Sequence, residues 1–217
     1  MRSYDAVIFD LDGTLLDTSE GISASVGFVI DALGLPRITP DVLRTFIGPP
    51  IQRSFARVFG MDKEGADMAA NMFRDRYKED DILLAIPYDG IFDTLAFLRD
   101  AGIRTAVATY KRQDYAEKIL VHFGFDKAVD AICGSDAEGI LTKSDIIENA
   151  IKKVGVTDRK RCVMVGDSDN DAEGAKGIGA PFIGVTYGFG FATKEDVDAF
   201  PNIGVAKDTK DILRIVL

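Results

Sequence analysis

Short apolar runs alternate with helical stretches along most of the chain. The runs have the length of buried strands, and we expect strands at residues 7–10, 105–108, 131–133, 162–165 and 181–185. Between them, apolar residues recur every three or four positions, which predicts helices near residues 90–101, 112–123, 144–154 and 170–178. Strands that alternate with helices predict an α/β fold, a Rossmann-like parallel sheet with helices on both faces.

Residues 17–82 have a different pattern, because they are helical throughout and contain no strand pattern. The first helix of this block ends at Gly34, another begins at Pro40, and two more are expected over 50–59 and 64–80. The block interrupts the alternation directly after the first strand. We therefore expect a helical cap, residues 17–82, inserted into an α/β core made of residues 1–16 and 83–217.

Composition and charge restrict the class of partner. The 217 residues are 47% hydrophobic and 28% charged, as in a soluble globular protein, and the formal net charge is −9. An acidic chain with no run of Lys or Arg argues against nucleic acid and anionic membranes as partners. The sequence has no secretory leader pattern and no membrane-spanning apolar run, so we expect a cytoplasmic protein. Cys133 and Cys162 lie in apolar contexts and are expected to be buried thiols.

Acidic residues follow two of the predicted strands. Asp10 and Asp12 come after the first strand, and Asp167, Asp169 and Asp171 follow the strand at 162–165. The carboxyl ends of parallel strands meet at one edge of the sheet, where α/β proteins bind ligands. Carboxylates this close raise each other's pKa unless a cation lies between them, and a hard divalent ion is the usual cation.

The same edge is expected to carry Thr109, at the end of the strand 105–108, and Lys143, at the start of a helix. A phosphate monoester repels nucleophiles, so catalysis of its transfer depends on positioning and on charge neutralisation. A metal held by Asp10 and Asp167, a hydroxyl and a lysine meet this need. A second carboxylate, Asp12, could protonate the leaving alkoxide and then activate water.

Two classes of protein with similar acidic patterns fit less well. Asp167, Asp169 and Asp171 match the first ligands of an EF-hand loop, but Ala172 and Ile178 replace its required Gly and Glu. A phosphorylated signalling receiver also uses acids, a Thr and a Lys on a parallel sheet, but it lacks a helical insertion and a second Gly-Asp motif.

At these positions the chain resembles the haloacid dehalogenase superfamily of phosphatases. The four motifs of that superfamily correspond to Phe9-Asp10-Leu11-Asp12-Gly13-Thr14-Leu15, Ala108-Thr109-Tyr110-Lys111, Lys143 and Val165-Gly166-Asp167-Ser168-x-x-Asp171. The helical block corresponds to the small cap of one subgroup. The resemblance implies a phosphatase that uses Mg²⁺, acts on a small phosphorylated metabolite and is a monomer or a homodimer.

The resemblance also implies a role for each matching residue. Asp10 would be the nucleophile that becomes aspartyl-phosphate, and also a Mg²⁺ ligand. Asp12 would be the general acid and base, with its backbone carbonyl on the metal. Asp167 would be a direct metal ligand, and Asp171 would support the metal.

Thr109 and the backbone of Tyr110 would bind phosphate, and Lys143 would pair with phosphate and Asp10. Ser144 and Asp145 stand where many members have prolines, and either could be the N-cap of the helix. Arg53, just past a Gly-Pro-Pro turn, either reaches the substrate from the cap or is an exposed arginine. Lys111 and Arg112 either add positive potential at the mouth of the site or are solvated.

Within the superfamily, the segments 46–51 and 185–190 are most similar to phosphoglycolate phosphatases. The substrate stays open among phosphoglycolate, a nucleoside monophosphate, a sugar phosphate and pyrophosphate. The alternative reaction is that of a phosphosugar mutase, in which the aspartyl-phosphate returns its phosphoryl group to the sugar.

Overall fold

The computed structural model describes residues 3–79, 81–137 and 139–217. Its centre is a six-stranded parallel sheet in the spatial order β5-β4-β1-β6-β7-β8. The strands are β1 (Ala6–Phe9), β4 (Arg104–Arg112), β5 (Ala131–Ser135), β6 (Cys162–Gly166), β7 (Phe182–Val185) and β8 (Gly204–Ala206). The five predicted strands and the parallel α/β class are confirmed. The sixth strand, β8, was not predicted because its three residues, Gly-Val-Ala, are too few to form an apolar run.

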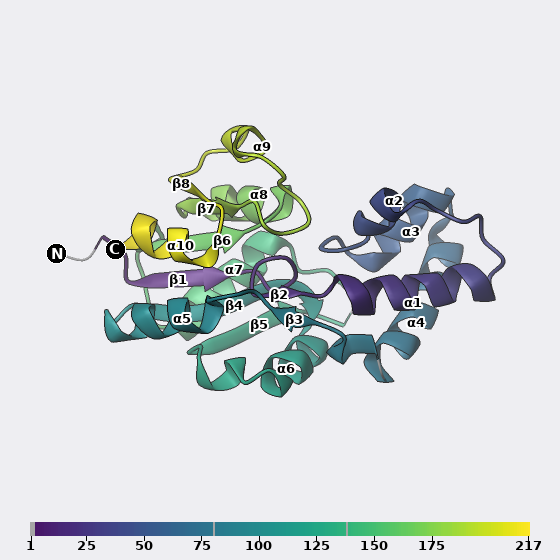
Figure 1. The fold of residues 1–217 in the computed structure, drawn as a ribbon, viewed down its shortest axis with the longest axis horizontal. Helices are drawn as coiled ribbons and strands as arrows, with labels where there is room; N and C mark the ends of the chain where they lie inside the picture. Colours follow the sequence, from purple (N-terminus) through teal and green to yellow (C-terminus); the bar gives the residue numbers. More distant parts are fainter. Residues whose placement is uncertain (1–2, 80, 138) are drawn as a thin grey trace.

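Helices cover both faces of the sheet (Figure 1) because alternate residues of a strand point to opposite faces. On β1, Val7 and Phe9 face the cluster that includes residues of α5, α6 and α10, whereas Ala6 and Ile8 face α7 and α8. These helices are α5 (Ile91–Asp100), α6 (Gln113–His122), α7 (Lys143–Lys153), α8 (Asp169–Ile178) and α10 (Thr209–Val216). All four side chains are fully buried, each Phe or Ile contributing about 1.5–3 kcal/mol. The strongly apolar β1 therefore anchors both layers.

A second group of helices lies beyond the carboxyl end of β1 (Figure 1). It consists of α1 (Ser19–Ala32), α2 (Pro40–Arg44), α3 (Ile51–Phe59) and α4 (Lys63–Glu79). Both connections to this group pass through a two-stranded antiparallel sheet made of β2 (Leu16–Asp17) and β3 (Ile86–Pro87). A cluster of Phe46, Phe55 and Phe59, with ring centroids 5.2–6.4 Å apart, packs inside it. The helical block thus has aromatic contacts of its own, and its buried residues continue the core on one face of the sheet.

The remaining elements are short. They are α9 (Lys194–Asp198) and the 3₁₀ turns at Asp81–Leu83, Phe125–Lys127 and Arg159–Arg161. Cys133 and Cys162 are buried free thiols, as expected.

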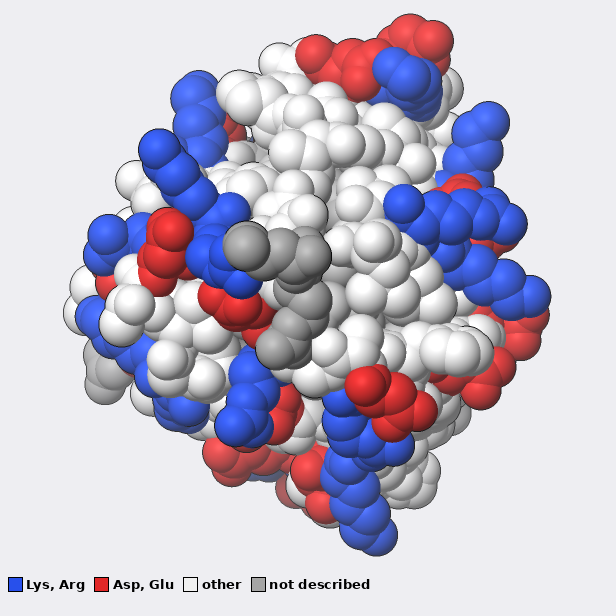
Figure 2. Space-filling model, turned by 90° about the vertical axis from the view of Figure 1, so that its left-hand side faces the viewer, with Lys and Arg blue, Asp and Glu red and all other residues white. Residues whose placement is uncertain are grey.

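The first described residues and the C-terminus lie at the end of the molecule opposite the helical block (Figure 1). At this end, Lys and Arg side chains lie beside Asp and Glu side chains around a pale central area (Figure 2). Within the described residues, no helix is both long and apolar enough to cross a membrane.

Candidate active site

Three buried carboxylates meet at the carboxyl ends of β1 and β6. Asp10 follows β1, Asp167 follows β6, and Asp171 lies in the first turn of α8. One oxygen from each lies within 4.8 Å of the others. β1 and β6 are neighbours where the strand order reverses, the place where open α/β sheets bind ligands. The topology therefore brings together residues that are more than 150 positions apart in the sequence.

Lys143 is the cation of this cluster. Its ammonium lies 2.6 Å from Asp10 Oδ1 and 2.7 Å from Asp171 Oδ1, and its side chain is 4% exposed. It is the first residue of α7, whose N-cap is Thr142, in a capping box with Asp145. The expectation that Ser144 or Asp145 is the N-cap is therefore wrong, because the Thr142 hydroxyl accepts from the Asp145 N–H at 3.2 Å. This cap starts α7 at Lys143.

The cluster carries more negative charge than Lys143 can balance. Burial raises the pKa of Asp10 from 3.8 to about 7; the attraction of Lys143 opposes the rise, and the nearby carboxylate of Asp171 adds to it. Burial and the charges of Asp171 and Asp10 raise the pKa of Asp167 to about 8. For Lys143, burial disfavours the charged form, but the attraction of both neighbouring carboxylates prevails and raises its pKa. The donor set is three buried carboxylates, of which two pair with one ammonium, and its chemistry fits a hard divalent cation such as Mg²⁺.

Asp167 is held in place by the loop after β7. Its Oδ2 accepts hydrogen bonds from the backbone N–H of Phe189 at 2.6 Å and of Gly190 at 3.2 Å. A Cβ atom added to Gly13 or to Gly188 would lie only 2.2 or 2.4 Å from the same oxygen. These two glycines therefore let the backbone approach the carboxylate from two sides, and Gly13 also adopts a φ of +84° that favours glycine.

The Asp12 carboxylate points away from the three-carboxylate cluster. Its Oδ1 accepts from the Thr18 hydroxyl at 2.6 Å and lies 3.1 Å from the Lys111 ammonium. Lys111 is itself buried and donates to the Tyr77 hydroxyl of α4 at 2.9 Å. Of the two readings of Lys111, exposed residue or positive group at the site, the structure places it inside as the ion-pair partner of Asp12.

Thr109 and Tyr110 each accept a hydrogen bond from the backbone of a site lysine. Thr109 is buried, and its hydroxyl accepts from the backbone N–H of Lys111 at 3.1 Å. The Tyr110 hydroxyl accepts from the backbone N–H of Lys143 at 3.0 Å. The bond from α7 to Tyr110 thus ties the lysine to the end of β4.

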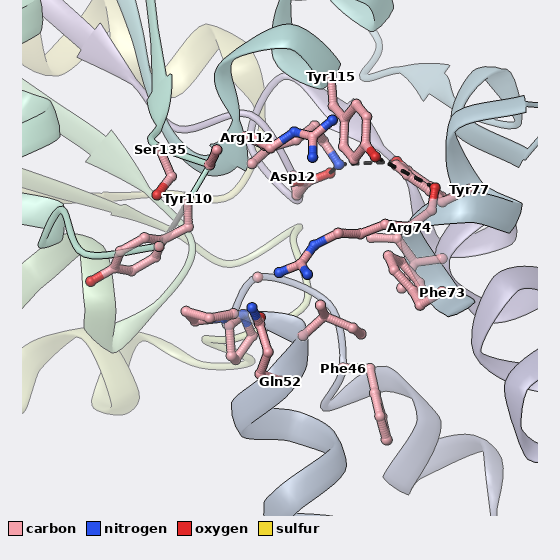
Figure 3. A pocket seen from close by; sticks show the side chains of 18 of the residues that line it. Asp12, Phe46, Gln52, Phe73, Arg74, Tyr77, Tyr110, Arg112, Tyr115 and Ser135 are labelled. Carbon is pink, nitrogen blue, oxygen red and sulfur yellow. Dashed lines mark hydrogen bonds and ion pairs between the residues drawn. The ribbon is translucent and has the colours of Figure 1, made fainter. Parts of the chain in front are cut away.

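A cavity lies between the helical block and this edge of the sheet (Figure 3). Asp12, Tyr110 and Lys111 line it from the sheet, and Gln52 and Arg74 line it from the helical block. Its empty space, including the part open to solvent, is about 800 Å³. The cavity is thus lined on one side by the segments at the carboxyl ends of β1 and β4, and on the other side by α3 and α4.

Arg53 is exposed and lies outside the residues that line the cavity, so the structure does not place it as a substrate contact. Thr18, Arg74 and Tyr77 are site residues that were not predicted from the sequence. Phe73, Arg74 and Tyr77 all line the cavity, and their spacing on α4 was an available indication of a shared face. Nothing around Thr18 in the sequence indicates its bond to Asp12.

The parallel sheet, the buried acidic edge and the helical block define a Rossmann-like protein with an acidic site at the carboxyl edge of its sheet. Residues 7–185 match the family described as Haloacid dehalogenase-like hydrolase, and the chain belongs to this family. It is 38% identical over 190 residues to a 5'-nucleotidase of Pseudomonas aeruginosa, covering 86% of this chain and 85% of that protein. It is 36% identical over 188 residues to a phosphoglycolate phosphatase of Agrobacterium fabrum, covering 84% of this chain and 80% of that protein.

Among solved structures, a predicted phosphatase from Clostridium acetobutylicum superposes with a TM-score of 0.89. It is 35% identical in sequence, and the match covers 97% of this chain and 99% of that one. The chain is therefore a phosphatase of this family.

Proposed function

We propose that the protein is a Mg²⁺-dependent phosphatase that hydrolyses a small phosphomonoester through an aspartyl-phosphate intermediate. The observation that carries the proposal is the buried cluster of Asp10, Asp167, Asp171 and Lys143 at the carboxyl edge of the sheet. We assign residues 17–82 to a cap and residues 1–16 and 83–217 to the catalytic core. The substrate cavity then lies between the two parts.

Asp10, Asp167 and Asp171, with the backbone carbonyl of Asp12, would hold the ion. When bound, Mg²⁺ supplies charge neutralisation for the phosphate oxygens and compensates the buried carboxylates. Lys143 occupies Asp10 Oδ1 at 2.6 Å, which leaves Oδ2 as the nucleophilic atom in our assignment. Asp167 Oδ2 is engaged by two backbone N–H groups, so Oδ1 is its metal-directed atom.

In the first step, Asp10 attacks phosphorus, and the bond from phosphorus to the leaving oxygen breaks. Asp12 donates its proton to that oxygen, so an alcohol leaves. Both contacts of Asp12, to Thr18 and to Lys111, use Oδ1, and the residue lines the cavity; we therefore assign the transferred proton to Oδ2. In the second step, Asp12 accepts a proton from water, and the water oxygen attacks phosphorus. The bond from phosphorus to the Asp10 oxygen breaks, which releases inorganic phosphate and regenerates the Asp10 carboxylate.

Thr109 and the backbone of Tyr110 would bind the phosphate oxygens opposite the ion. Thr109 is buried at the end of β4, where its hydroxyl is already oriented by the N–H of Lys111. A fixed hydroxyl and backbone donors cost no reorganisation during the reaction.

The test is release of inorganic phosphate from phosphoglycolate, AMP, a hexose phosphate, pyrophosphate and p-nitrophenyl phosphate, with Mg²⁺ and with EDTA. We expect Mg²⁺-dependent release that Asp10→Asn abolishes. Asp169→Asn is the matched control, because Asp169 lies in the same acidic run and is exposed, and it should keep the parent activity. Full activity of Asp10→Asn would refute the nucleophile assignment. Transfer of the phosphoryl group to a second sugar position, without net phosphate release, would instead identify a mutase.

A further inference from the structure

The cavity contains one cation for which no ion pair with a carboxylate is seen among the described residues. Arg74 extends from α4 across the middle of the cavity toward the side of Tyr110, with Arg112 and Gln52 on either side of it (Figure 3). Its Nη1 donates a hydrogen bond to the neutral Asn71 Oδ1 at 3.0 Å. The side chain is half-buried, and burial lowers its pKa; the charge of Arg112 acts in the same direction, whereas Tyr115 and Asp67 oppose the shift.

The other described charges on the cavity wall already have partners. Lys111 pairs with Asp12 at 3.1 Å. Arg112 forms a two-pronged pair with Asp114 and lies over the Tyr115 ring. The carboxylate of the lining residue Asp136 accepts from backbone N–H groups of the loop that follows it. Within the described part of the wall, Arg74 is therefore the cation without an ion-pair contact.

We propose that Arg74 binds an anionic group on the leaving part of the substrate. This inference rests on the proposed function, because Asp12 lines the same cavity and would protonate the leaving oxygen. The leaving group must then extend from Asp12 into the part of the cavity next to the Arg74 guanidinium. A guanidinium presents two parallel N–H donors that match a carboxylate or a phosphate, and such charge-assisted bonds are the strong ones.

The substrate class that follows is a phosphomonoester or anhydride with a second negative charge close to the scissile bond. Gln52 lies on α3 of the helical block and lines the same cavity, so its amide can donate to a second oxygen of such a group. An ester with a neutral leaving group would leave Arg74 buried against the ligand without a partner, which is costly. Arg74 would thus act as a specificity residue, and the phosphate chemistry would stay with the sheet edge.

The experiment compares kcat/KM for three substrates that differ in the leaving group. The leaving part of phosphoglycolate carries a carboxylate and that of pyrophosphate is a phosphate. Ethyl phosphate is similar in size to phosphoglycolate, but its leaving part, ethanol, is uncharged. We expect the parent to prefer one of the two anionic substrates, and which one it prefers identifies the anion. Arg74→Gln should lower kcat/KM for that substrate by roughly 10- to 150-fold and change ethyl phosphate little. Arg74→Lys should fall between, because it keeps the charge but loses the two-pronged geometry.

The matched control is Arg44→Gln. Arg44 is an exposed arginine of α2 outside the cavity lining. Its replacement should leave unchanged the ratio of kcat/KM for the preferred anionic substrate to kcat/KM for ethyl phosphate. Retained turnover of ethyl phosphate by Arg74→Gln shows that the variant is folded. Equal losses on substrates with a charged and with an uncharged leaving part would overturn the inference. So would a parent that prefers AMP over both phosphoglycolate and pyrophosphate. Failure to hydrolyse any ester would instead overturn the proposed function.

Discussion

Replacing Asp10 with Asn should stabilise the metal-free protein while it abolishes catalysis. Burial raises the pKa of Asp10 from 3.8 to about 7, so the folded state binds this proton more tightly than the unfolded state does. The contribution of the Asp10 proton to the free energy of unfolding is therefore fully present below pH 3.8, and it is lost as the pH rises through about 7. At 1.36 kcal/mol per pKa unit, the full loss is about 4 kcal/mol. Asn has nearly the same shape and no charge to bury, so the variant avoids this loss.

The magnitude depends on pH in a defined way. At pH 5.5 Asp10 of the folded protein is largely protonated, and at pH 8.5 it is ionised. The linkage relation predicts that Asp10→Asn gains about 2 kcal/mol more stability at pH 8.5 than at pH 5.5. The assay is urea unfolding in EDTA at both pH values, followed by circular dichroism. Asp169→Asn, which changes an exposed carboxylate of the same acidic run, should have the same small effect at both.

Equal stability changes for Asp10→Asn at the two pH values would refute the reasoning. The buried carboxylate would then impose no pH-dependent cost. A destabilised variant at pH 8.5 would show that the ion pair of Asp10 with Lys143 outweighs the burial of the charge.

Three further outcomes follow from the same geometry. Asp167→Ala should raise the half-saturating Mg²⁺ concentration strongly and remove the Mg²⁺-induced rise in Tm; an unchanged metal titration would exclude Asp167 from the ligand set. Tyr77→Phe removes the hydroxyl that Lys111 donates to, and should lower the free energy of unfolding by about 1 kcal/mol without loss of the fold; no change in urea unfolding would show that water replaces this bond. Adding Mg²⁺ to the parent should flatten the decline of its stability between pH 5.5 and 8.5, and an equally steep decline with Mg²⁺ would contradict compensation of the carboxylates by the ion.

Much of the fold could be predicted from the sequence, because apolar periodicity reports burial directly. The five apolar runs became β1, β4, β5, β6 and β7. The β2–β3 pair and β8 could not be predicted in this way, because strands of two or three residues contain no periodic pattern. Their pairing depends on segments that only the tertiary fold brings together.

The site could be predicted to the extent that it depends on strand ends. Asp10, Asp167 and Thr109 directly follow apolar runs, so a parallel sheet places them at one edge. Contacts between the helical block and the sheet follow from the orientation of that block, which no local pattern determines. The position of Arg53 and Arg74 in the chain therefore does not indicate which of them enters the cavity. Arg74 lines it, whereas Arg53 lies outside its lining.

The antiparallel pair of β2 and β3 has a consequence for how the molecule can vary. It joins the two ends of the intervening segment, residues 18–85, so that the helical block closes as a loop on the sheet. The closure entropy of a loop grows only logarithmically, by about 0.6 kcal/mol for each doubling of length, against a typical domain stability of about 5–15 kcal/mol. Insertion of residues into this segment, or its replacement by another segment, therefore lowers the stability of the β1–β4 pairing only slightly. New leaving-group pockets can arise there while the acidic edge of the sheet stays unchanged.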